Sequence, residues 1–194
     1  MDSGRKYVSR GGLKLEHALQ AFAINPSGKI CLDAGASTGG FTDCLLQHGA
    51  EKVYAVDVAY GQFDWKLRND PRVVVIERQN IRYLSALQVP DKVTLVCLDL
   101  AFISLKKIFP VLVPFLSPEA VLIALIKPQF EVAKSEVGEK GVVKDPVLHD
   151  RVVKEIREAG EHQGWKCLGI TPSPLLGPEG NREFLILFLV PELL

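Results

Sequence analysis

The stretch that decides the fold is Leu32–Gly40, which reads L-D-A-G-A-S-T-G-G. An apolar run, Lys29–Leu32, leads into it, and a helical pattern over Phe41–Gln47 follows it. A second apolar run, Lys52–Val56, is followed at once by Asp57. This order of strand, glycine-rich turn, helix and acid-tipped strand is typical of a nucleoside pocket, because glycines admit the ligand to the backbone and the acid accepts hydrogen bonds from ribose hydroxyls.

The details of the turn indicate which ligand it takes. A dinucleotide turn reads G-x-G-x-x-G, with its middle glycine against a pyrophosphate. Here Ser37 occupies that middle position, between Gly35 and Gly39, and its side chain disfavours a pyrophosphate. Asp33 suits a cationic ligand, and S-adenosylmethionine carries an ammonium, a sulfonium and a ribose but no phosphate. We therefore predict an S-adenosylmethionine site. It includes Asp33, Gly35, Ser37, Gly39 and Asp57, and an ordinary tight α/β turn is the alternative.

The composition limits the remaining possibilities. The 194 residues are enough for one domain with a sizeable core, and Lys+Arg and Asp+Glu both number 23, so the net charge is zero. A neutral domain has no general attraction for a polyanion, so nucleic-acid binding would need a local patch or a partner domain. The four cysteines form no C-x-x-C, so we expect reduced thiols and a cytoplasmic protein. The four histidines lack the spacing of metal ligands, so we expect them on the surface and expect no metal site. No segment has 18 uninterrupted apolar residues, so we expect no membrane span.

Apolar runs and helical patterns alternate along the chain, which predicts a Rossmann-like, doubly wound α/β sheet whose last strand is antiparallel. The expected strands are Lys29–Leu32, Lys52–Val56, Arg72–Ile76, Val93–Leu98, Ala120–Ile126, Trp165–Ile170 and Glu183–Val190. The expected helices are Ser9–Phe22, Phe41–Gln47, Ile81–Leu87, Leu105–Leu116 and Val147–His162, the last with Val147, Val152, Val153 and Ile156 on its apolar side.

Polar residues at the strand ends are the candidates for chemistry, because ligands of such sheets bind at the carboxyl ends of the strands. Asn80 follows the third strand and either reads an adenine edge or serves as a turn residue. Asp99 and Lys127 each follow an apolar run, where charged groups are rare unless they are paired or functional.

Six separated stretches together resemble the TlyA family, whose members are often labelled hemolysins and carry an FtsJ-like (RrmJ-like) ribose methyltransferase domain. They are Ser9–Leu15, Asp33–Gly40, Asp99–Leu105, Lys127–Glu131, Gly141–Pro146 and Gly180–Phe184. The resemblance spans nearly the whole chain, roughly residues 6 to 190. It implies methyl transfer from S-adenosylmethionine to a ribose 2′-hydroxyl of ribosomal RNA, typically of a cytidine. It also implies a Lys-Asp-Lys-Glu tetrad, which maps onto Lys14, Asp99, Lys127 and Glu183.

One departure from the family concerns domain organisation. TlyA-like proteins usually begin with a small basic RNA-binding domain, whereas here Lys14 lies close to Met1. We expect residues 1–194 to form a single methyltransferase domain that lacks this module and partners with ribosomal RNA or ribosomal subunits. A basic cluster of Arg5, Lys6 and Arg10 either contacts RNA phosphates or faces water.

Other classes of function remain as alternatives. A base methyltransferase usually presents Asn/Asp-Pro-Pro-aromatic after the fourth strand, but here that position reads Asp99-Leu-Ala-Phe102. Ser37 opposes a nicotinamide-binding module, and the short, strand-like apolar runs oppose a membrane-lytic protein. A module that binds S-adenosylmethionine without catalysis is opposed by the complete tetrad. The long stretch Gln129–Lys144 is either a lid over the site or a mobile loop.

Overall fold

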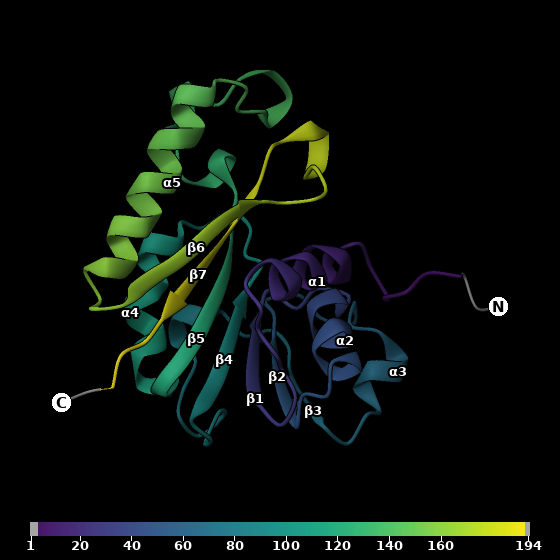
Figure 1. The fold of residues 1–194 in the computed structure, drawn as a ribbon. Helices are drawn as coiled ribbons and strands as arrows, with labels where there is room; N and C mark the ends of the chain where they lie inside the picture. Colours follow the sequence, from purple (N-terminus) through teal and green to yellow (C-terminus); the bar gives the residue numbers. More distant parts are fainter. Residues whose placement is uncertain (1–3, 193–194) are drawn as a thin grey trace.

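The computed structural model describes residues 4–192, and its centre is a seven-stranded sheet (Figure 1). The strands are β1 (Ile30–Ala34), β2 (Lys52–Val56), β3 (Val73–Ile76), β4 (Val93–Leu98), β5 (Leu116–Ile126), β6 (Lys166–Pro172) and β7 (Phe184–Leu189). They lie in the order β3-β2-β1-β4-β5-β7-β6, with β1 to β5 parallel and β7 antiparallel to both of its neighbours. The predicted doubly wound sheet with an antiparallel last strand is confirmed.

Helices cover both faces of the sheet, as Figure 1 shows. On one face lie α1 (Gly11–Ala21), α2 (Gly40–Gln47) and the short α3 (Trp65–Arg68). On the other lie α4 (Phe109–Leu112) and α5 (Pro146–Glu161). The chain order of the strands reverses between β1 and β4, so a ligand crevice is expected at the carboxyl ends of these two strands.

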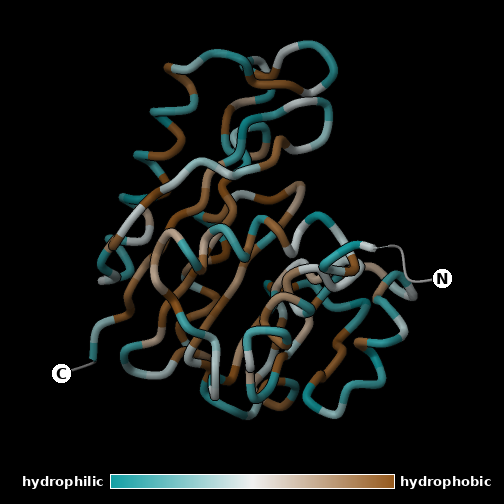
Figure 2. Tube along the Cα trace, turned by 45° about the vertical axis from the view of Figure 1, so that its right-hand side comes forward, coloured by the Kyte–Doolittle hydropathy of each residue, from teal (hydrophilic) through white to brown (hydrophobic). Residues whose placement is uncertain are grey.

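The core consists of two hydrophobic clusters separated by the sheet. Along β4, Val96 and Leu98 belong to the cluster on the α5 face, and Leu95 and Cys97 belong to the cluster on the α1 face. Successive strand residues point to opposite faces, so a strand covered on both sides must be apolar at nearly every position. Figure 2 shows these brown, apolar strand segments in the interior and teal, polar segments in the connecting loops.

Two predicted helices are wrong. Over Ile81–Leu87 only a single 3-10 turn forms, Ile81–Tyr83, because Leu84 is extended and Leu87, at 94% exposed, has no surface to pack on. The expected helix Leu105–Leu116 is divided into a 3-10 turn, α4 and a second 3-10 turn. Pro110 and Pro114 lack the N–H that a continuous helix needs, so each starts a new turn.

The long helix α5 departs from prediction in its first turn. Asp145 caps it by accepting a 2.9 Å hydrogen bond from the Val147 N–H, and Val152 and Ile156 are buried as expected. Val147, expected on the apolar side, is 72% exposed. His149, expected on the surface, is instead buried, and its Nε2 lies 2.8 Å from the Val143 carbonyl oxygen.

The stretch Gln129–Lys144 is anchored to the body of the protein. Arg151 of α5 holds Glu136 through two hydrogen bonds of 2.8 and 2.7 Å. The Asn181 side chain accepts a 3.0 Å hydrogen bond from the Val143 N–H. Helix α5 and the loop between β6 and β7 therefore hold this stretch in place.

Residues 4–192 contain neither a membrane-spanning helix nor a cluster of metal-ligating side chains. No helix there is long and apolar enough to cross a membrane. No group of three or more His, Cys, Asp or Glu side chains there is arranged to hold a metal ion. The four cysteines are free thiols, and Cys31, Cys44 and Cys97 are buried.

Candidate active site

A cleft with two lobes lies at the carboxyl ends of β1, β2, β4 and β5. The α1 lobe, of about 340 Å³, is bounded by α1, the glycine-rich turn and the loop between β6 and β7. The β2 lobe, of about 660 Å³, is bounded by the segments that follow β2, β3 and β4. Both lobes are lined by Gly35, Ser37, Asp99 and Lys127, which we call the junction. A reaction between ligands in the two lobes would take place at the junction.

The junction contains the first lysine–carboxylate pair. Asp99 follows β4 and Lys127 follows β5, two neighbouring parallel strands, so their side chains leave the sheet at the same edge. The Lys127 Nζ lies 2.6 Å from the Asp99 Oδ1, as an ion-pair contact without the alignment of a hydrogen bond. The side chains are 14% and 23% exposed, so both remain accessible from the cleft.

The second lysine–carboxylate pair, Lys14 and Glu183, lines the α1 lobe. Lys14 of α1 donates a 2.5 Å hydrogen bond from Nζ to the Glu183 Oε2, joining residues 169 positions apart in the sequence. The Glu183 side chain has no exposed surface, and its Oε1 accepts no hydrogen bond. The β6–β7 loop presses on this carboxylate, since a Cβ at Gly177 would lie 2.1 Å from the Glu183 Oε1. All four tetrad residues line the α1 lobe.

Two glycines of the glycine-rich turn, Gly35 and Gly39, have different tasks. Gly35 has a φ of 87°, and a Cβ there would lie 2.3 Å from the Asp99 carbonyl oxygen, so glycine lets β1 and β4 end side by side. Gly39 has a φ of 99° and is the N-cap of α2, and a Cβ there would lie 2.4 Å from the Leu67 Cδ1. Gly39 faces α3, and the lining of the α1 lobe continues at Gly40.

Asp57 and Asn80 both line the β2 lobe. The Asp57 Oδ2 accepts a 2.7 Å hydrogen bond from the Ser37 N–H, and its Oδ1 accepts one of 2.7 Å from the Ala59 N–H. Each carboxylate oxygen can accept a further hydrogen bond. Asn80 is a turn residue, since its Oδ1 accepts a 3.0 Å hydrogen bond from the Arg82 N–H, and it lines the lobe as well.

Asp33 lies beneath the turn, where its side chain is fully buried. The Thr42 hydroxyl donates a 2.6 Å hydrogen bond to the Asp33 Oδ2, and the Oδ1 accepts none. Burial raises the pKa of Asp33 to about 7, and the negative charges of Asp99 and Asp57 act in the same direction. The structure thus places this acid behind the cleft wall, and its contact with a ligand stays a prediction.

Two further residues line the cleft besides the predicted site residues. Phe102 lines the β2 lobe, is 90% exposed and has a left-handed backbone with a φ of 61°. Arg10 of the N-terminal basic cluster lines the α1 lobe and is exposed. The sequence shows an aromatic residue after β4 and a basic arm, but only the tertiary structure shows which of these side chains face the cleft.

Comparisons with known proteins agree with this geometry. The family model for FtsJ-like methyltransferase matches residues 7–189. The chain belongs to the FtsJ-like methyltransferase family. It is 52% identical over 185 residues to the 16S/23S rRNA (cytidine-2′-O)-methyltransferase TlyA of Mycobacterium tuberculosis, a match covering 95% of this chain and 69% of that protein. It is 44% identical to Hemolysin A of Brachyspira hyodysenteriae, covering 95% and 78% of the two chains.

Solved structures that resemble this FtsJ-like chain include a hemolysin-named protein and an N-methyltransferase. A hemolysin-named protein from Streptococcus thermophilus superposes with a TM-score of 0.93 at 40% identity, over 98% of this chain and 70% of that one. The N-methyltransferase NodS of Bradyrhizobium japonicum shares the fold alone, with a TM-score of 0.64 at 14% identity over 95% of this chain and 99% of that one. The expected resemblance to TlyA and the methyltransferase fold are confirmed, and the roles of the individual site residues stay predictions.

Proposed function

We propose that this chain is the catalytic domain of a cytoplasmic methyltransferase that transfers a methyl group from S-adenosylmethionine to a ribose 2′-hydroxyl of ribosomal RNA. The observation that carries the proposal is the arrangement of the tetrad, in which two lysine–carboxylate pairs converge on the α1 lobe and one of them stands at the junction with the β2 lobe. The name of the related TlyA supports a cytidine as the target.

The β2 lobe fits the cofactor. Asp57 keeps acceptor capacity for ribose hydroxyls, and Asn80 offers amide groups to a base. Leu100 and Ile103 supply apolar wall to the same lobe. When bound, S-adenosylmethionine supplies an electrophilic methyl group on a sulfonium.

The chain's own residues then act on the acceptor hydroxyl, which must lose its proton as the new C–O bond forms. Lys127, held at the junction by Asp99, presents a cationic donor to the developing alkoxide, while the hydroxyl proton passes to solvent water. Lys14, fixed by Glu183, places a second positive charge in the α1 lobe. This geometry favours orientation and electrostatic stabilisation by Lys127, with general-base action as the alternative that the Lys127→Arg variant described below distinguishes.

Two exposed side chains suit an RNA strand. Arg10 presents a guanidinium to the α1 lobe, in a position to hold a phosphate of the target nucleotide. Phe102 offers an exposed ring at the entrance of the β2 lobe, beside Phe130 at a ring-centroid distance of 4.9 Å. Single-stranded RNA is commonly held by such a combination of cationic and aromatic groups.

The experiment is methyl transfer from isotopically labelled S-adenosylmethionine to purified ribosomal subunits and to deproteinised ribosomal RNA. The RNA is then digested to nucleosides and analysed by mass spectrometry. The proposal expects 2′-O-methylcytidine in the wild-type reaction and about a hundredfold less with Lys127→Ala. A methylated base would instead establish a base methyltransferase. Binding of S-adenosylmethionine without any transfer to RNA would establish a binding module.

A further inference from the structure

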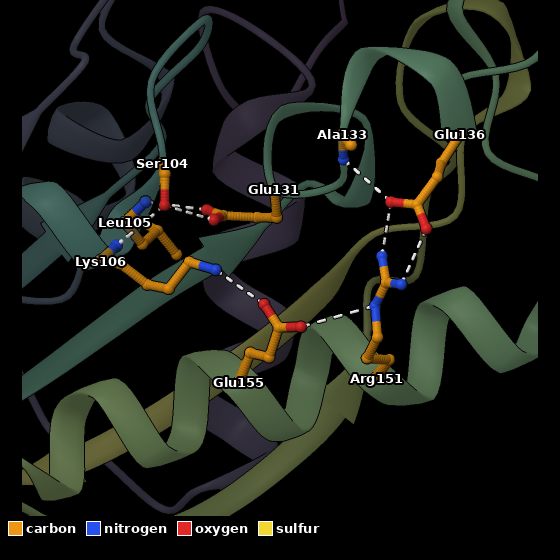
Figure 3. A network of polar contacts seen from close by, with 8 residues as sticks. All are labelled: Ser104, Leu105, Lys106, Glu131, Ala133, Glu136, Arg151 and Glu155. Carbon is orange, nitrogen blue, oxygen red and sulfur yellow. Dashed lines mark hydrogen bonds and ion pairs between the residues drawn. The ribbon is translucent and has the colours of Figure 1, made fainter.

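A half-buried carboxyl outside the tetrad, that of Glu131, joins the two loops that carry the junction pair. We call Asp99–Ser104 the β4 loop and Lys127–Glu131 the β5 loop. Glu131 accepts a 2.5 Å hydrogen bond at Oε2 from the Ser104 hydroxyl and one of 2.8 Å at Oε1 from the Leu105 N–H, as Figure 3 shows. Burial raises the pKa of Glu131 above its ordinary value. The reaction proposed above assigns no task to this residue.

The two loops form a ring that is closed at both ends. At one end Lys127 contacts Asp99 at 2.6 Å, and at the other end Glu131 holds Ser104. Midway along the ring, Phe102 packs on Phe130. Each arm of the ring is only five or six residues long, so the contact at one end limits how far the arms can separate at the other.

The β4 loop needs such support because its backbone is strained. Phe102 has a φ of 61°, and left-handed backbone costs a non-glycine residue about 1–3 kcal/mol. With 90% of its surface exposed, Phe102 gains little burial to offset this cost. The loop is fixed where it begins by a 3.0 Å hydrogen bond from the Asp99 N–H to the Ala34 carbonyl, and where it ends by Glu131.

We propose that Glu131 is a positioning residue that latches the β4 loop to the β5 loop. The latch keeps the Asp99 and Lys127 side chains in contact at the junction and keeps Phe102 at the entrance of the β2 lobe. Its catalytic consequence rests on the proposed function, but the latch itself is a property of the fold.

The same region supplies a matched control. Lys106 lies two residues beyond Ser104 and its Nζ lies 2.7 Å from the Glu155 Oε2 of α5, in the network of Figure 3. Both of these side chains are more than a third exposed, so this ion pair should contribute little. Glu155→Gln therefore removes a carboxylate from the same network without touching the latch.

The first measurement is amide hydrogen exchange of residues 99–106, followed by mass spectrometry on the full chain. Glu131→Ala removes the acceptor of the Leu105 N–H, so exchange in this segment should become about tenfold faster. Glu155→Gln should leave it within twofold of the wild type. Unchanged exchange in Glu131→Ala would overturn the proposal. If that variant does not fold, Ser104→Ala removes one hydrogen bond of the latch and should accelerate exchange about threefold, read over residues 99–105 because the Ser104 Oγ also accepts from the Lys106 N–H.

The second measurement is the methylation rate at saturating S-adenosylmethionine and RNA, on protein shown to be folded by its unfolding temperature. Misplacing the junction pair should lower kcat about tenfold or more in Glu131→Ala, and Glu131→Gln, which keeps an acceptor for the Leu105 N–H, should recover part of the loss. A folded Glu131→Ala variant with the kcat of Glu155→Gln would overturn the positioning role. If the wild type transfers no methyl to RNA, the proposed function fails, and the exchange result alone decides whether the latch exists.

Discussion

The two lysine–carboxylate pairs of the cleft are alike in chemistry and different in setting. Lys127 and Asp99 extend from neighbouring parallel strands, stand at the junction of both lobes and keep exposed surface. Lys14 and Glu183 come from the first helix and the last strand connection, line only the α1 lobe, and include a carboxylate with no exposed surface. An accessible pair can act on substrates in both lobes, whereas a buried pair mainly fixes structure. We therefore expect Asp99 and Lys127 to act on ligands of both lobes, and Glu183 mainly to fix Lys14 beside the α1 lobe.

The largest expected effect concerns the stability contributed by the buried pair. Lys14→Ala leaves the Glu183 carboxylate buried without its cation, which should lower the free energy of unfolding by about 3–5 kcal/mol. The control is Lys6→Ala, since Lys6 pairs with Glu16 but is 54% exposed and should contribute about 0–1 kcal/mol. Urea unfolding of both variants measures the difference. Equal losses would show that burial of the Glu183 carboxylate does not increase the cost of removing its lysine.

The next effect concerns chemistry at the accessible pair. Lys127→Ala should lower the methylation rate about a hundredfold or more and leave the affinity for S-adenosylmethionine nearly unchanged, because the interaction is made in the transition state. Lys127→Arg keeps the charge but cannot deprotonate, so recovery by arginine would indicate an electrostatic role. The exposed Lys134 provides the control variant Lys134→Ala. A wild-type rate for Lys127→Ala under saturating conditions would overturn the tetrad assignment.

A smaller effect tests the β2 lobe as the cofactor side of the junction. Asp57→Ala removes the proposed ribose acceptor and the acceptor of the Ser37 N–H, so cofactor binding should weaken by about 1–3 kcal/mol. Calorimetric titration with S-adenosylmethionine measures the change, and the exposed Asp150 supplies the control Asp150→Ala. Tight binding of NAD with no response to S-adenosylmethionine would contradict the cofactor assignment itself.

A pH dependence is expected from Asp33, a buried carboxyl whose observed hydrogen-bond donor is a hydroxyl and not a lysine. Its pKa is raised from 3.8 to about 7 in the folded protein, so the folded state binds more protons than the unfolded state between these values. The contribution of Asp33 to stability is therefore greatest below about pH 4, falls by at most about 1.4 kcal/mol per pH unit as the pH rises, and levels off above about pH 7. Asp33→Asn should remove this slope, measured by urea unfolding from pH 4 to pH 8. An unaltered slope would show that another group is responsible.

Much of the fold could be predicted because local pattern and tertiary role agree in the strands. Runs such as Val93–Leu98 are apolar at nearly every position, and only a strand covered on both faces buries such a run. Helices were predicted less well where pattern and backbone chemistry conflict. The stretch from Leu105 to Leu116 has apolar residues at helical spacing, but Pro110 and Pro114 interrupt its hydrogen bonds.

The candidate site, like the fold, could be predicted from the sequence only in part. The sequence by itself determined the residue types and placed Asp57, Asp99 and Lys127 at strand ends, because parallel strands bring their carboxyl ends to one edge. It also carried the resemblance that named Lys14 and Glu183. Only the tertiary structure decided that Asp33 lies behind the cleft wall and that Phe102 lines the β2 lobe with most of its surface exposed. The physical reason is that the direction and burial of a side chain depend on elements far away in the sequence, as when α1 and the end of the β6–β7 loop meet to form the second pair.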